Sequence, residues 1–512
     1  MFPRLPVVAS RRLLRGALSA SPIHQFSKPV HKASTPIIHV RAQSGLSAAM
    51  ERQDFLGGFH LVNELAVQQP KFDLSPERSV QRVLFLTNSF NSMAQRAYVE
   101  LKDKYSMDIR VEIAIDEKQM VESVRRHEPD VIICPFLTKR IPEEIWSNTD
   151  TPCLIVHPGI HGDRGASSID WALKEKSTEW GVTVLQADEE MDAGAIWATS
   201  NFPVPSEITK SELYGTYVVD TAMECLHDAI AKISSGKQGT PLDYSDPTVM
   251  GTLRPNMKIK DRTVDFNGNA NDVASAICFS DSAPGAPCVI GGHKVFAYNA
   301  HVDRSSDANI QGEPVSSPGT ITGQLNGAVR VACGDGSIWI THMKGRGKDT
   351  QLPRIKLPST QCLPDEVTKP VMEVVEPCLF ASPRDSPFRD LWVEVEDGVA
   401  TINFPFLNGA MSTTQCERLT EAFRDTCARP DVKVVVLAGG TSAWSNGINL
   451  NTIEASDDPA DESWKNINAI NDFVKAVFSE KEKVIVAALQ GNAGVRGYLV
   501  LDCELNICYS SC

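Results

Sequence analysis

Short apolar runs alternate with helical segments over residues 82–157, and this alternation constrains the fold more than any other feature of the chain. The runs, which are typical of buried strands, cover residues 82–87, 109–115, 130–135 and 153–156. The helical segments between them cover residues 93–104, 117–126 and 141–146. Strands that alternate with helices predict a parallel, doubly wound α/β sheet. No Gly-x-Gly-x-x-Gly turn follows the first strand, so we expect no bound dinucleotide.

His157 stands where the last of these strands ends and a glycine-rich turn begins. The turn spans residues 158–165, and a helix is expected to follow it. In open α/β sheets, ligands bind and reactions take place at this edge. A lone histidine is more often a packing residue than a catalyst, but this position favours catalysis. Arg164 in the turn and the hydroxyls of Ser167 and Ser168 at the helix start are further candidates.

A strand at residues 181–186 and an acidic loop at residues 187–194 complete the predicted site. Asp192 in this loop follows His157 by one helix and one strand, which is enough chain to return beside it. A carboxylate near an imidazole raises its pKa and fixes its tautomer, as acyl transfer requires. We therefore expect His157 and Asp192 to be catalytic. The other acidic residues of the loop equally fit a solvated surface.

Composition excludes several classes of function. A net charge of −14, with no long basic run to offset it, argues against a nucleic-acid partner. No apolar stretch approaches the roughly 20 residues that span a bilayer. The 13 cysteines lack Cys-x-x-Cys spacing, so no metal site is expected. Small molecules are the expected partners, and the oligomeric state stays open.

The first 50 residues differ in kind from the rest of the chain. They contain many Arg, Lys and Ser residues and no acidic residue before Glu51. Leucines lie near one face of a possible helix at residues 1–18, a composition typical of an organellar transit peptide. We therefore expect residues 1–50 to direct the chain to the mitochondrial matrix. A plastid or the cytoplasm are the alternatives.

The region around His157 resembles the formyltransferases that use 10-formyltetrahydrofolate. In that family a strand ends in Asn-x-His, an Arg-Gly turn leads into a helix, and Gly-Val-Thr precedes a Leu-Asp-x-Gly loop. The matching segments are His157, Arg164-Gly165, Gly181-Val-Thr183 and Met191-Asp192-Ala-Gly194, whereas Ile155 occupies the asparagine position. The resemblance implies a Rossmann-like catalytic domain at residues 81–248. The residues expected to bind the substrate are Asn88, Ser89, Asn91, Arg164, Ser167, Ser168, Gln186 and Asp188.

Residues 250–357 resemble the small, OB-like β-barrel that follows the catalytic domain in formyltransferases. The short strands expected there cover residues 283–288, 294–296, 318–321 and 329–335. Nothing in this part has a catalytic pattern, so we assign it to support and ligand positioning. The Pro-rich, weakly periodic stretch at residues 358–387 is expected to be a linker.

Residues 388–512 resemble part of the crotonase (enoyl-CoA hydratase/isomerase) family. A hairpin around Asp397-Gly398 leads through a helix and a buried strand to the loop Trp444-Ser-Asn-Gly-Ile-Asn-Leu450. In crotonases such a loop donates a backbone N–H to the thioester oxygen of an acyl-CoA. The resemblance therefore implies an oxyanion site at Gly447 and Ile448.

The second backbone donor of that family is expected at Arg496 and Gly497. An arginine at a donor glycine would crowd the thioester. The sequence stops at Cys512, where a crotonase domain would continue. We therefore expect a partial, C-terminally truncated crotonase domain.

The order of these three parts resembles the hydrogenase maturation factors of the HypX/HoxX type. That resemblance covers about residues 81–498 and includes the segments Cys134-Pro-Phe-Leu-Thr-Lys139 and Ser167-Ser-Ile-Asp-Trp171. It implies that formyl passes from 10-formyltetrahydrofolate to coenzyme A, and that the crotonase part decarbonylates formyl-CoA to carbon monoxide. Three functions stay open: a formyltransferase with an inert crotonase part, the full two-step enzyme, and a non-catalytic folate- or CoA-binding protein.

Overall fold

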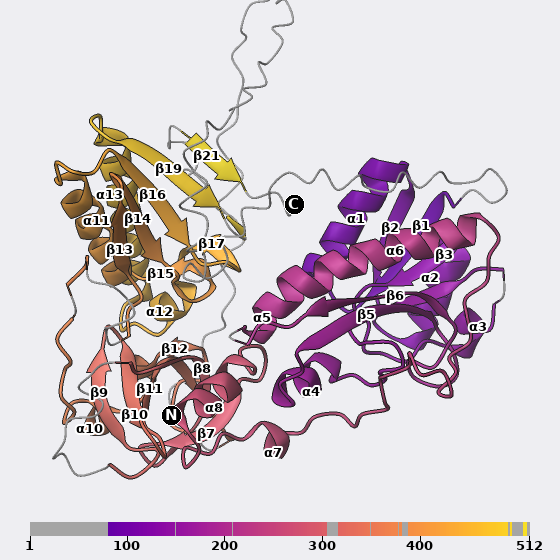
Figure 1. Cartoon of the computed structure of the whole chain (residues 1–512), viewed down its shortest axis with the longest axis horizontal. Coiled ribbons are helices and arrows are strands. Elements are labelled where there is room, and N and C mark those ends of the chain that lie inside the picture. Colours follow the sequence, from indigo (N-terminus) through magenta and orange to yellow (C-terminus); the bar gives the residue numbers. More distant parts are fainter. Residues whose placement is uncertain are drawn as a thin grey trace, which may run out of the picture. The chain divides into compact units, whose positions relative to one another are not determined.

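The computed structural model describes residues 80–489 except 149, 207, 305–315, 349, 377 and 381–387, together with residues 492–493 and the backbone of 505–508. Three sets of buried apolar residues mark three folded parts along the chain (Figure 1). The predicted transit peptide and the predicted donors Arg496 and Gly497 lie outside the described residues. None of the helices in the described part has the length and apolar character of a bilayer-crossing segment.

The first part is built on a six-stranded sheet with the order β2-β1-β3-β4-β5-β6. Its strands are β1 (Arg82–Thr87), β2 (Asp108–Ile113), β3 (Val131–Cys134), β4 (Cys153–His157), β5 (Glu179–Gln186) and β6 (Ile196–Pro203). The first four strands are parallel, as predicted, but β5 and β6 are antiparallel to their neighbours. The parallel arrangement predicted from residues 82–157 therefore holds for the first four strands and does not extend to β5 and β6. β6 runs antiparallel to β5 because the loop that joins them, residues 187–195, is shorter than the about a dozen or more residues that a parallel return needs.

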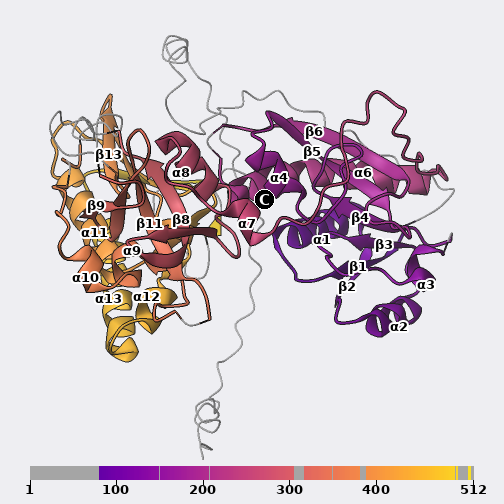
Figure 2. The ribbon, with the colours of Figure 1, turned by 90° about the horizontal axis from the view of Figure 1, so that it is seen from below.

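Helices cover both faces of this sheet (Figures 1 and 2). They are α1 (Ser92–Tyr105), α2 (Glu117–His127), α3 (Glu143–Trp146), α4 (Ser168–Lys174), α5 (Lys210–Leu213), the π-helical turn η3 (Tyr214–Val218) and α6 (Val219–Ser234). Alternate residues of β1 enter two cores. Val83 and Phe85 pack with α1 and α6, and Leu84 and Leu86 pack with α2 and α3. Burial on both faces explains why these strands are apolar at nearly every position.

The second part is an antiparallel sheet with the order β7-β8-β11-β10-β9, and β12 pairs with β11. Its strands are β7 (Ala286–Ile290), β8 (His293–Val302), β9 (Ile321–Leu325), β10 (Ala328–Ala332), β11 (Ser337–Gly345) and β12 (Leu357–Pro358). The helix α8 (Ala270–Cys278) buries Val273 and Ile277 against it, and α7 (Ile259–Arg262) precedes α8. The strand expected at 294–296 therefore lies near the start of the much longer β8.

The segment expected to be a linker begins with packed structure. Beyond β12, residues of the predicted stretch 358–387 form α9 (Ser359–Cys362) and α10 (Asp365–Thr368). Cys362 and Leu363 are buried in the core of the second part. Proline-rich composition is misleading here because Pro358 and Pro364 serve as N-caps of these two short helices.

The third part has a five-stranded sheet with the order β13-β14-β16-β19-β21. Its helices and strands are β13 (Trp392–Glu396), β14 (Val399–Phe404), η6 (Leu407–Gly409), β15 (Ala410–Met411), α11 (Thr413–Cys427), β16 (Val434–Gly439), β17 (Ala443–Ser445), β18 (Gly447–Ile448), α12 (Leu450–Glu454), α13 (Pro459–Ser479), β19 (Val484–Leu489), β20 (Asn492–Ala493) and β21 (Leu505–Cys508). The hairpin β13–β14 is antiparallel, and β14, β16, β19 and β21 are parallel. Residues of α11 and α13 share one core with the sheet.

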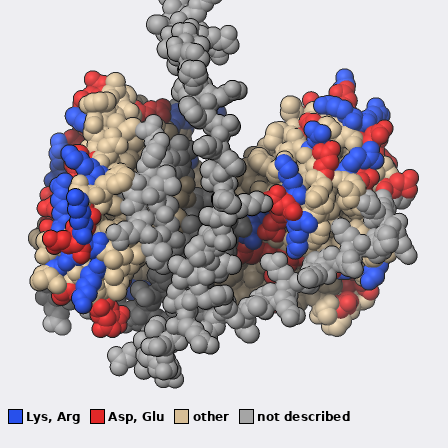
Figure 3. All heavy atoms as spheres, turned by 90° about the horizontal axis from the view of Figure 1, so that it is seen from above, with Lys and Arg blue, Asp and Glu red and all other residues tan. Residues whose placement is uncertain are grey.

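Charges on the described surface occur mostly as mixed pairs. Figure 3 shows basic and acidic side chains side by side on the face that it draws. Pairs such as Arg82–Glu128 and Lys118–Glu122 are exposed. Exposed pairs of this kind contribute only about 0–1 kcal/mol each. The buried charged side chains include Asp163 and Asp192, which flank His157.

Candidate active site

His157 is the last residue of β4, and its imidazole lies buried between two carboxylates. The Nε2 atom is 2.9 Å from Oδ2 of Asp163, and the Nδ1 atom is 3.6 Å from Oδ2 of Asp192. All three side chains are buried. The structure therefore brings together His157 and Asp192, and it adds Asp163, for which the sequence predicted no role.

The two carboxylates determine the protonation of His157. Burial by itself lowers the pKa of an imidazole, because it disfavours the charged form. Here the hydrogen bond to Asp163 and the negative charges of Asp192 and Asp163 outweigh burial, and the pKa of His157 is raised. Because a protonated imidazole donates from both nitrogens, the imidazolium matches the acceptors on its two sides.

The glycine-rich turn after β4 brings Asp163 back onto the histidine. The Asp163 backbone N–H donates to the carbonyl of Ile160 at 2.8 Å, which closes the turn. A Cβ atom on Gly159 would lie 2.5 Å from Oδ2 of Asp163 and would also strike the imidazole ring. The direct contact between His157 and Asp163 therefore requires glycine at position 159. The three glycines in this turn are the sequence signal that could have drawn attention to Asp163.

Asp192 reaches the histidine by a route that the sequence did not predict. Because β5 is antiparallel to β4, Gln186 pairs with Leu154 at the far end of β4. The loop after β5 then carries the chain back, and Asp192 adopts a left-handed backbone with φ 53°. Its Oδ2 atom accepts the backbone N–H of Gly165 at 3.0 Å. This bond joins the acidic loop to the turn that carries Asp163.

Three predicted substrate-binding residues are engaged in holding these loops. Arg164 donates from Nε to the Met191 carbonyl at 2.8 Å and also pairs with Glu190. The Ser168 hydroxyl donates to the carbonyl of Pro158 at 2.7 Å, and the Ser167 hydroxyl accepts the N–H of Met257 at 3.0 Å. These bonds position the turn and the acidic loop, and a substrate contact for the three residues stays a prediction.

The other predicted substrate-binding residues lie after β1 and β5. Asn88 pairs with Thr138, and Asn91 caps α1 by accepting the Ala94 N–H and donates to the Tyr214 hydroxyl. Gln186 accepts from the indole of Trp197 at 3.3 Å. Ser89 and Asp188 are exposed. A substrate contact for these five residues stays a prediction.

Ile155 occupies the position where the formyltransferase pattern has asparagine, and the structure shows how this side chain packs. It is partly buried and packs against the core between the sheet and the helices α2 and α3. An isoleucine side chain donates no hydrogen bond, so this position cannot stabilise a developing oxyanion.

A segment at residues 243–257, here named the strap, lies along the turn after β4. The Tyr244 hydroxyl donates to the Gly162 carbonyl at 3.0 Å, and the Gly251 N–H donates to the His161 carbonyl at 2.9 Å. Arg254 in the strap places its Nε atom 3.8 Å from Oδ1 of Asp163. The strap therefore closes the side of the site that carries Asp163.

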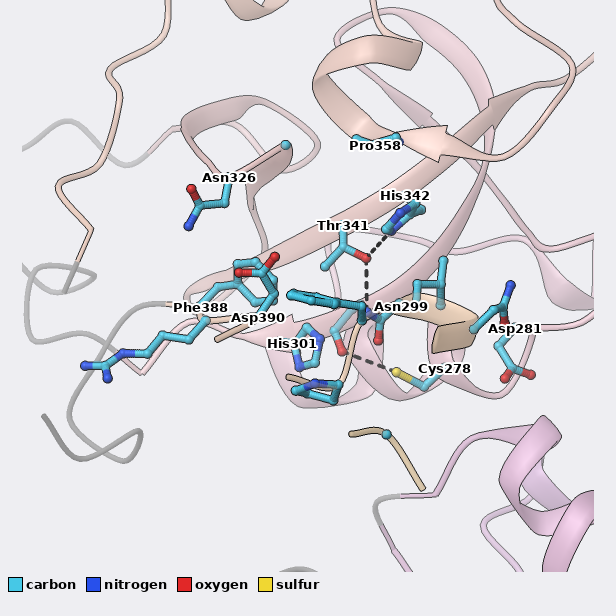
Figure 4. A pocket seen from close by; sticks show the side chains of 18 of the residues that line it. Cys278, Asp281, Asn299, His301, Asn326, Thr341, His342, Pro358, Phe388 and Asp390 are labelled. Carbon is cyan, nitrogen blue, oxygen red and sulfur yellow. Dashed lines mark hydrogen bonds between the residues drawn. The ribbon is translucent and has the colours of Figure 1, made fainter. Parts of the chain in front are cut away.

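Residues of all three parts line a separate cavity of about 1140 Å³ (Figure 4). Its walls include Ser211 and Glu212 from α5, His301 and Thr341 from the second part, and the segment 440–442 from the third. His157 does not line it. Figure 4 shows the hydrogen-bonded row of Asn299, Thr341 and His342 on one wall.

The predicted oxyanion residues Gly447 and Ile448 form β18, which pairs with β15. The Gly447 N–H lies 3.3 Å from the hydroxyl of Ser445, within hydrogen-bond distance. Since Arg496 and Gly497 lie outside the described residues, the two-donor arrangement stays a prediction. Among the residues that the structure describes, no group of three or more His, Cys, Asp or Glu side chains is arranged so that it could hold a metal ion.

Comparison with known proteins identifies the family. The model for the family described as "Formyl transferase" matches residues 92–230, and the model for its C-terminal domain matches residues 256–354. Hydrogenase maturation factor HoxX of Bradyrhizobium diazoefficiens is 37% identical over 418 residues, which are 81% of this chain and 69% of HoxX. The chain belongs to the HoxX/HypX family of hydrogenase maturation factors. It is a formyltransferase-type enzyme.

Two further relatives support this placement. HypX of Aquifex aeolicus, crystallised in complex with tetrahydrofolic acid, is 38% identical with a TM-score of 0.75 over 84% of this chain and 72% of HypX. Methionyl-tRNA formyltransferase of Thermotoga maritima is 29% identical over 238 residues, 46% of this chain and 72% of that enzyme. The HoxX/HypX match therefore extends past the two formyltransferase regions into the third part.

The expected location in the mitochondrial matrix is wrong. HoxX and HypX, the relatives that match most of the chain, are bacterial proteins, and bacteria have no mitochondria. A basic, serine-rich and acid-free composition is common to several kinds of N-terminal segment. Composition alone is therefore too weak a signal to fix a compartment.

Proposed function

We propose that this chain transfers a formyl group from 10-formyltetrahydrofolate to the thiol of coenzyme A. The observation that carries the proposal is the buried group of His157, Asp192 and Asp163 within the region matched by the formyl transferase family. The complex of HypX with tetrahydrofolic acid supports a folate as the formyl donor. The catalytic residues in this proposal are His157 and Asp192.

The proposed reaction exchanges one acyl bond for another. The bond between the formyl carbon and N10 of the folate breaks, and a bond between that carbon and the thiol sulfur forms. His157 gives a proton to N10 as it leaves, and the thiol returns a proton to His157. Asp192 stabilises the charged imidazole and holds its orientation. Protons and electrons balance over the turnover.

The cavity described above supports a large acceptor. Ligand pockets usually measure about 300–1,000 Å³, so a cavity of about 1140 Å³ has room for much of a molecule the size of coenzyme A. Its walls come from all three parts of the chain. Because His157 does not line it, the thiol end of the acceptor must extend beyond the cavity to meet the formyl group.

The domain limits and the second oxyanion site remain part of the proposal. We assign the formyltransferase domain to residues 81–248, the barrel to 250–357 and the partial crotonase domain to 388–512. Within the last, the Ile448 N–H is the better candidate thioester donor, since the Gly447 N–H lies near Ser445.

Formation of formyl-CoA tests the proposed function directly. The full-length chain is mixed with 10-formyltetrahydrofolate and coenzyme A, and formyl-CoA is followed by mass spectrometry. His157→Ala should lower the rate by about a hundredfold or more, because it removes the general acid. His161→Ala, in the same turn, is the matched control and should retain the rate. Equal rates for the two variants, or no formyl-CoA from the unmodified chain, would refute the proposal.

A further inference from the structure

Asp163 contacts His157 more closely than the predicted catalytic partner Asp192 does. Its Oδ2 atom is at hydrogen-bond distance from Nε2, whereas Asp192 stands 3.6 Å from Nδ1. We propose that Asp163 is a positioning residue that holds His157 as an imidazolium and turns its Nδ1–H toward Asp192, with Arg254 of the strap weakening that hold. This inference rests on the proposed function for its catalytic meaning, but its central claim can be measured without turnover.

The geometry favours the imidazolium over a neutral imidazole as the resting form. A neutral ring carries one N–H and one lone pair, and here each ring nitrogen faces a carboxylate oxygen. Whichever nitrogen kept the lone pair would face a negative charge. Protonation of both nitrogens removes that repulsion, and it lets Nε2 donate to Asp163 while Nδ1 stays directed at Asp192.

The proton on Nε2 of His157 stabilises the Asp163 carboxylate, because few other groups compensate its negative charge. Its side chain is 0% exposed, and its Oδ1 atom has no hydrogen-bond partner among the described residues. The Nε atom of Arg254 faces that oxygen at 3.8 Å, beyond hydrogen-bond distance, and the guanidinium pairs instead with Glu175. A buried carboxylate without a close cation is costly. His157 is the close cation, so Asp163 and His157 stabilise each other's charged forms.

The other arginine near the histidine is directed away from it. Arg164 lies in the same turn, but its guanidinium bonds to Glu190 and to the Met191 carbonyl. Arg254 is thus the positive group that acts on the pair, through Asp163. It competes with His157 for the charge of that carboxylate.

This arrangement decides which ring nitrogen of His157 can give a proton to the substrate. With Nε2 tied to Asp163, the proton available to a substrate is the one on Nδ1, on the side where the contact with Asp192 is loose. A leaving amine nitrogen such as N10 takes up a proton. The arrangement therefore presets His157 as the acid for that step and orients it before the substrate binds.

Two variants with opposite expected shifts test the proposal. The full-length chain is labelled with ¹³C at histidine Cε1, and the His157 resonance is assigned with His157→Gln and titrated by NMR. Asp163→Asn should lower the titration midpoint of His157, because a negative partner becomes neutral. Arg254→Gln should raise it, because a competing positive charge is lost. Glu175→Gln, at the other partner of Arg254, is the control and should shift it far less than either.

The outcomes separate the possible explanations. A midpoint that Asp163→Asn leaves unchanged, or shifts of the same sign in both variants, overturns the proposal, since general damage does not produce opposite signs. If Asp163→Asn fails to fold, Arg254→Gln decides alone: a raised midpoint supports the proposal and an unchanged one overturns it. In the formyl-CoA assay, Asp163→Asn should lower kcat by about a hundredfold with the KM for the folate little changed. An unmodified chain with the expected midpoints but no formyl transfer would refute the proposed function only.

Discussion

At the scale of single residues, the site depends on a glycine, which has no side chain, at position 159. Asp163 reaches His157 only because nothing projects from Gly159 into the space between them. The same turn places the Gly165 N–H on Asp192. The positions of the two carboxylates and the imidazole therefore depend on glycines at positions 159 and 165, where a Cβ atom would clash.

We expect Gly159→Ala to abolish most formyl transfer while the chain stays folded. Its Cβ atom would separate the imidazole from Asp163, and loss of general acid catalysis typically costs about a hundredfold or more. Gly215→Ala is the matched control, because a Cβ atom there meets nothing within 4 Å. Rates for both variants, compared with their melting temperatures, check the prediction. Full activity in Gly159→Ala would show that the contact with Asp163 is not needed.

A second residue-scale prediction concerns acid sensitivity. Burial, and to a lesser extent the charge of Lys356, lower the pKa of His342 to about 3. A histidine in the unfolded chain titrates near about 6.5, so neutral His342 adds stability above that pH, and this is lost as the pH falls toward about 3. His342→Gln should therefore lose less thermal stability between about pH 7 and pH 5 than the unmodified chain does. Parallel losses in the two proteins, measured by calorimetry, would contradict this assignment.

At the scale of elements, the start of α1 shows a structural role for Asn91, a residue that was predicted to bind the substrate. The Asn91 side chain caps the helix and holds the Tyr214 hydroxyl. Tyr214 begins the π-helical turn that joins α5 to α6. One side chain thus ties the entry of α1 to an irregular turn.

Asn91→Ala should destabilise the chain by about 1 kcal/mol, the usual cost of losing an N-cap, and should leave the KM for the folate nearly unchanged. Asn91→Asp keeps the acceptor for the Ala94 N–H and should recover most of the loss. Thermal unfolding and steady-state rates measure the two effects. A large rise in KM without loss of stability would restore the substrate-binding interpretation.

The strands and helices also show which parts of the fold local sequence patterns can predict. The strands β1 to β4 and the hairpin β13–β14 follow from apolar runs and a turn signal, which are local properties. The direction of β6 depends on the length of the loop that joins it to β5, and the packing of Cys362 and Leu363 depends on a distant sheet. The role of Asp163 could not be predicted for a similar reason: it requires a turn that folds back on His157, and the spacing of the glycines indicates the turn but not its direction. Ile155 could be recognised only because the family pattern was known.

At the scale of the whole molecule, the proposed reaction needs the parts to act together. The cavity is walled by all three, and the Thr441 hydroxyl of the third part donates to Glu212 of the first. The Asn451 side chain of the third part donates to the Lys356 carbonyl of the second at 2.9 Å. An acceptor bound in the cavity would therefore contact the third part even when formyl transfer occurs in the first.

The last prediction separates acceptor binding from donor binding. Ser442 is exposed on the cavity wall, so Ser442→Trp should narrow the cavity without touching the group around His157. We expect the KM for coenzyme A to rise by about tenfold, which corresponds to about 1.4 kcal/mol of lost contact, while affinity for a formyl-folate analogue stays the same. Glu454→Trp, exposed in the third part but outside the cavity lining, is the control for a surface tryptophan. Calorimetry with the analogue and initial rates with coenzyme A provide the two readings. If both substrates lose affinity together, the cavity and the His157 site are one compartment. If neither does, coenzyme A binds elsewhere and the cavity has no part in the transfer.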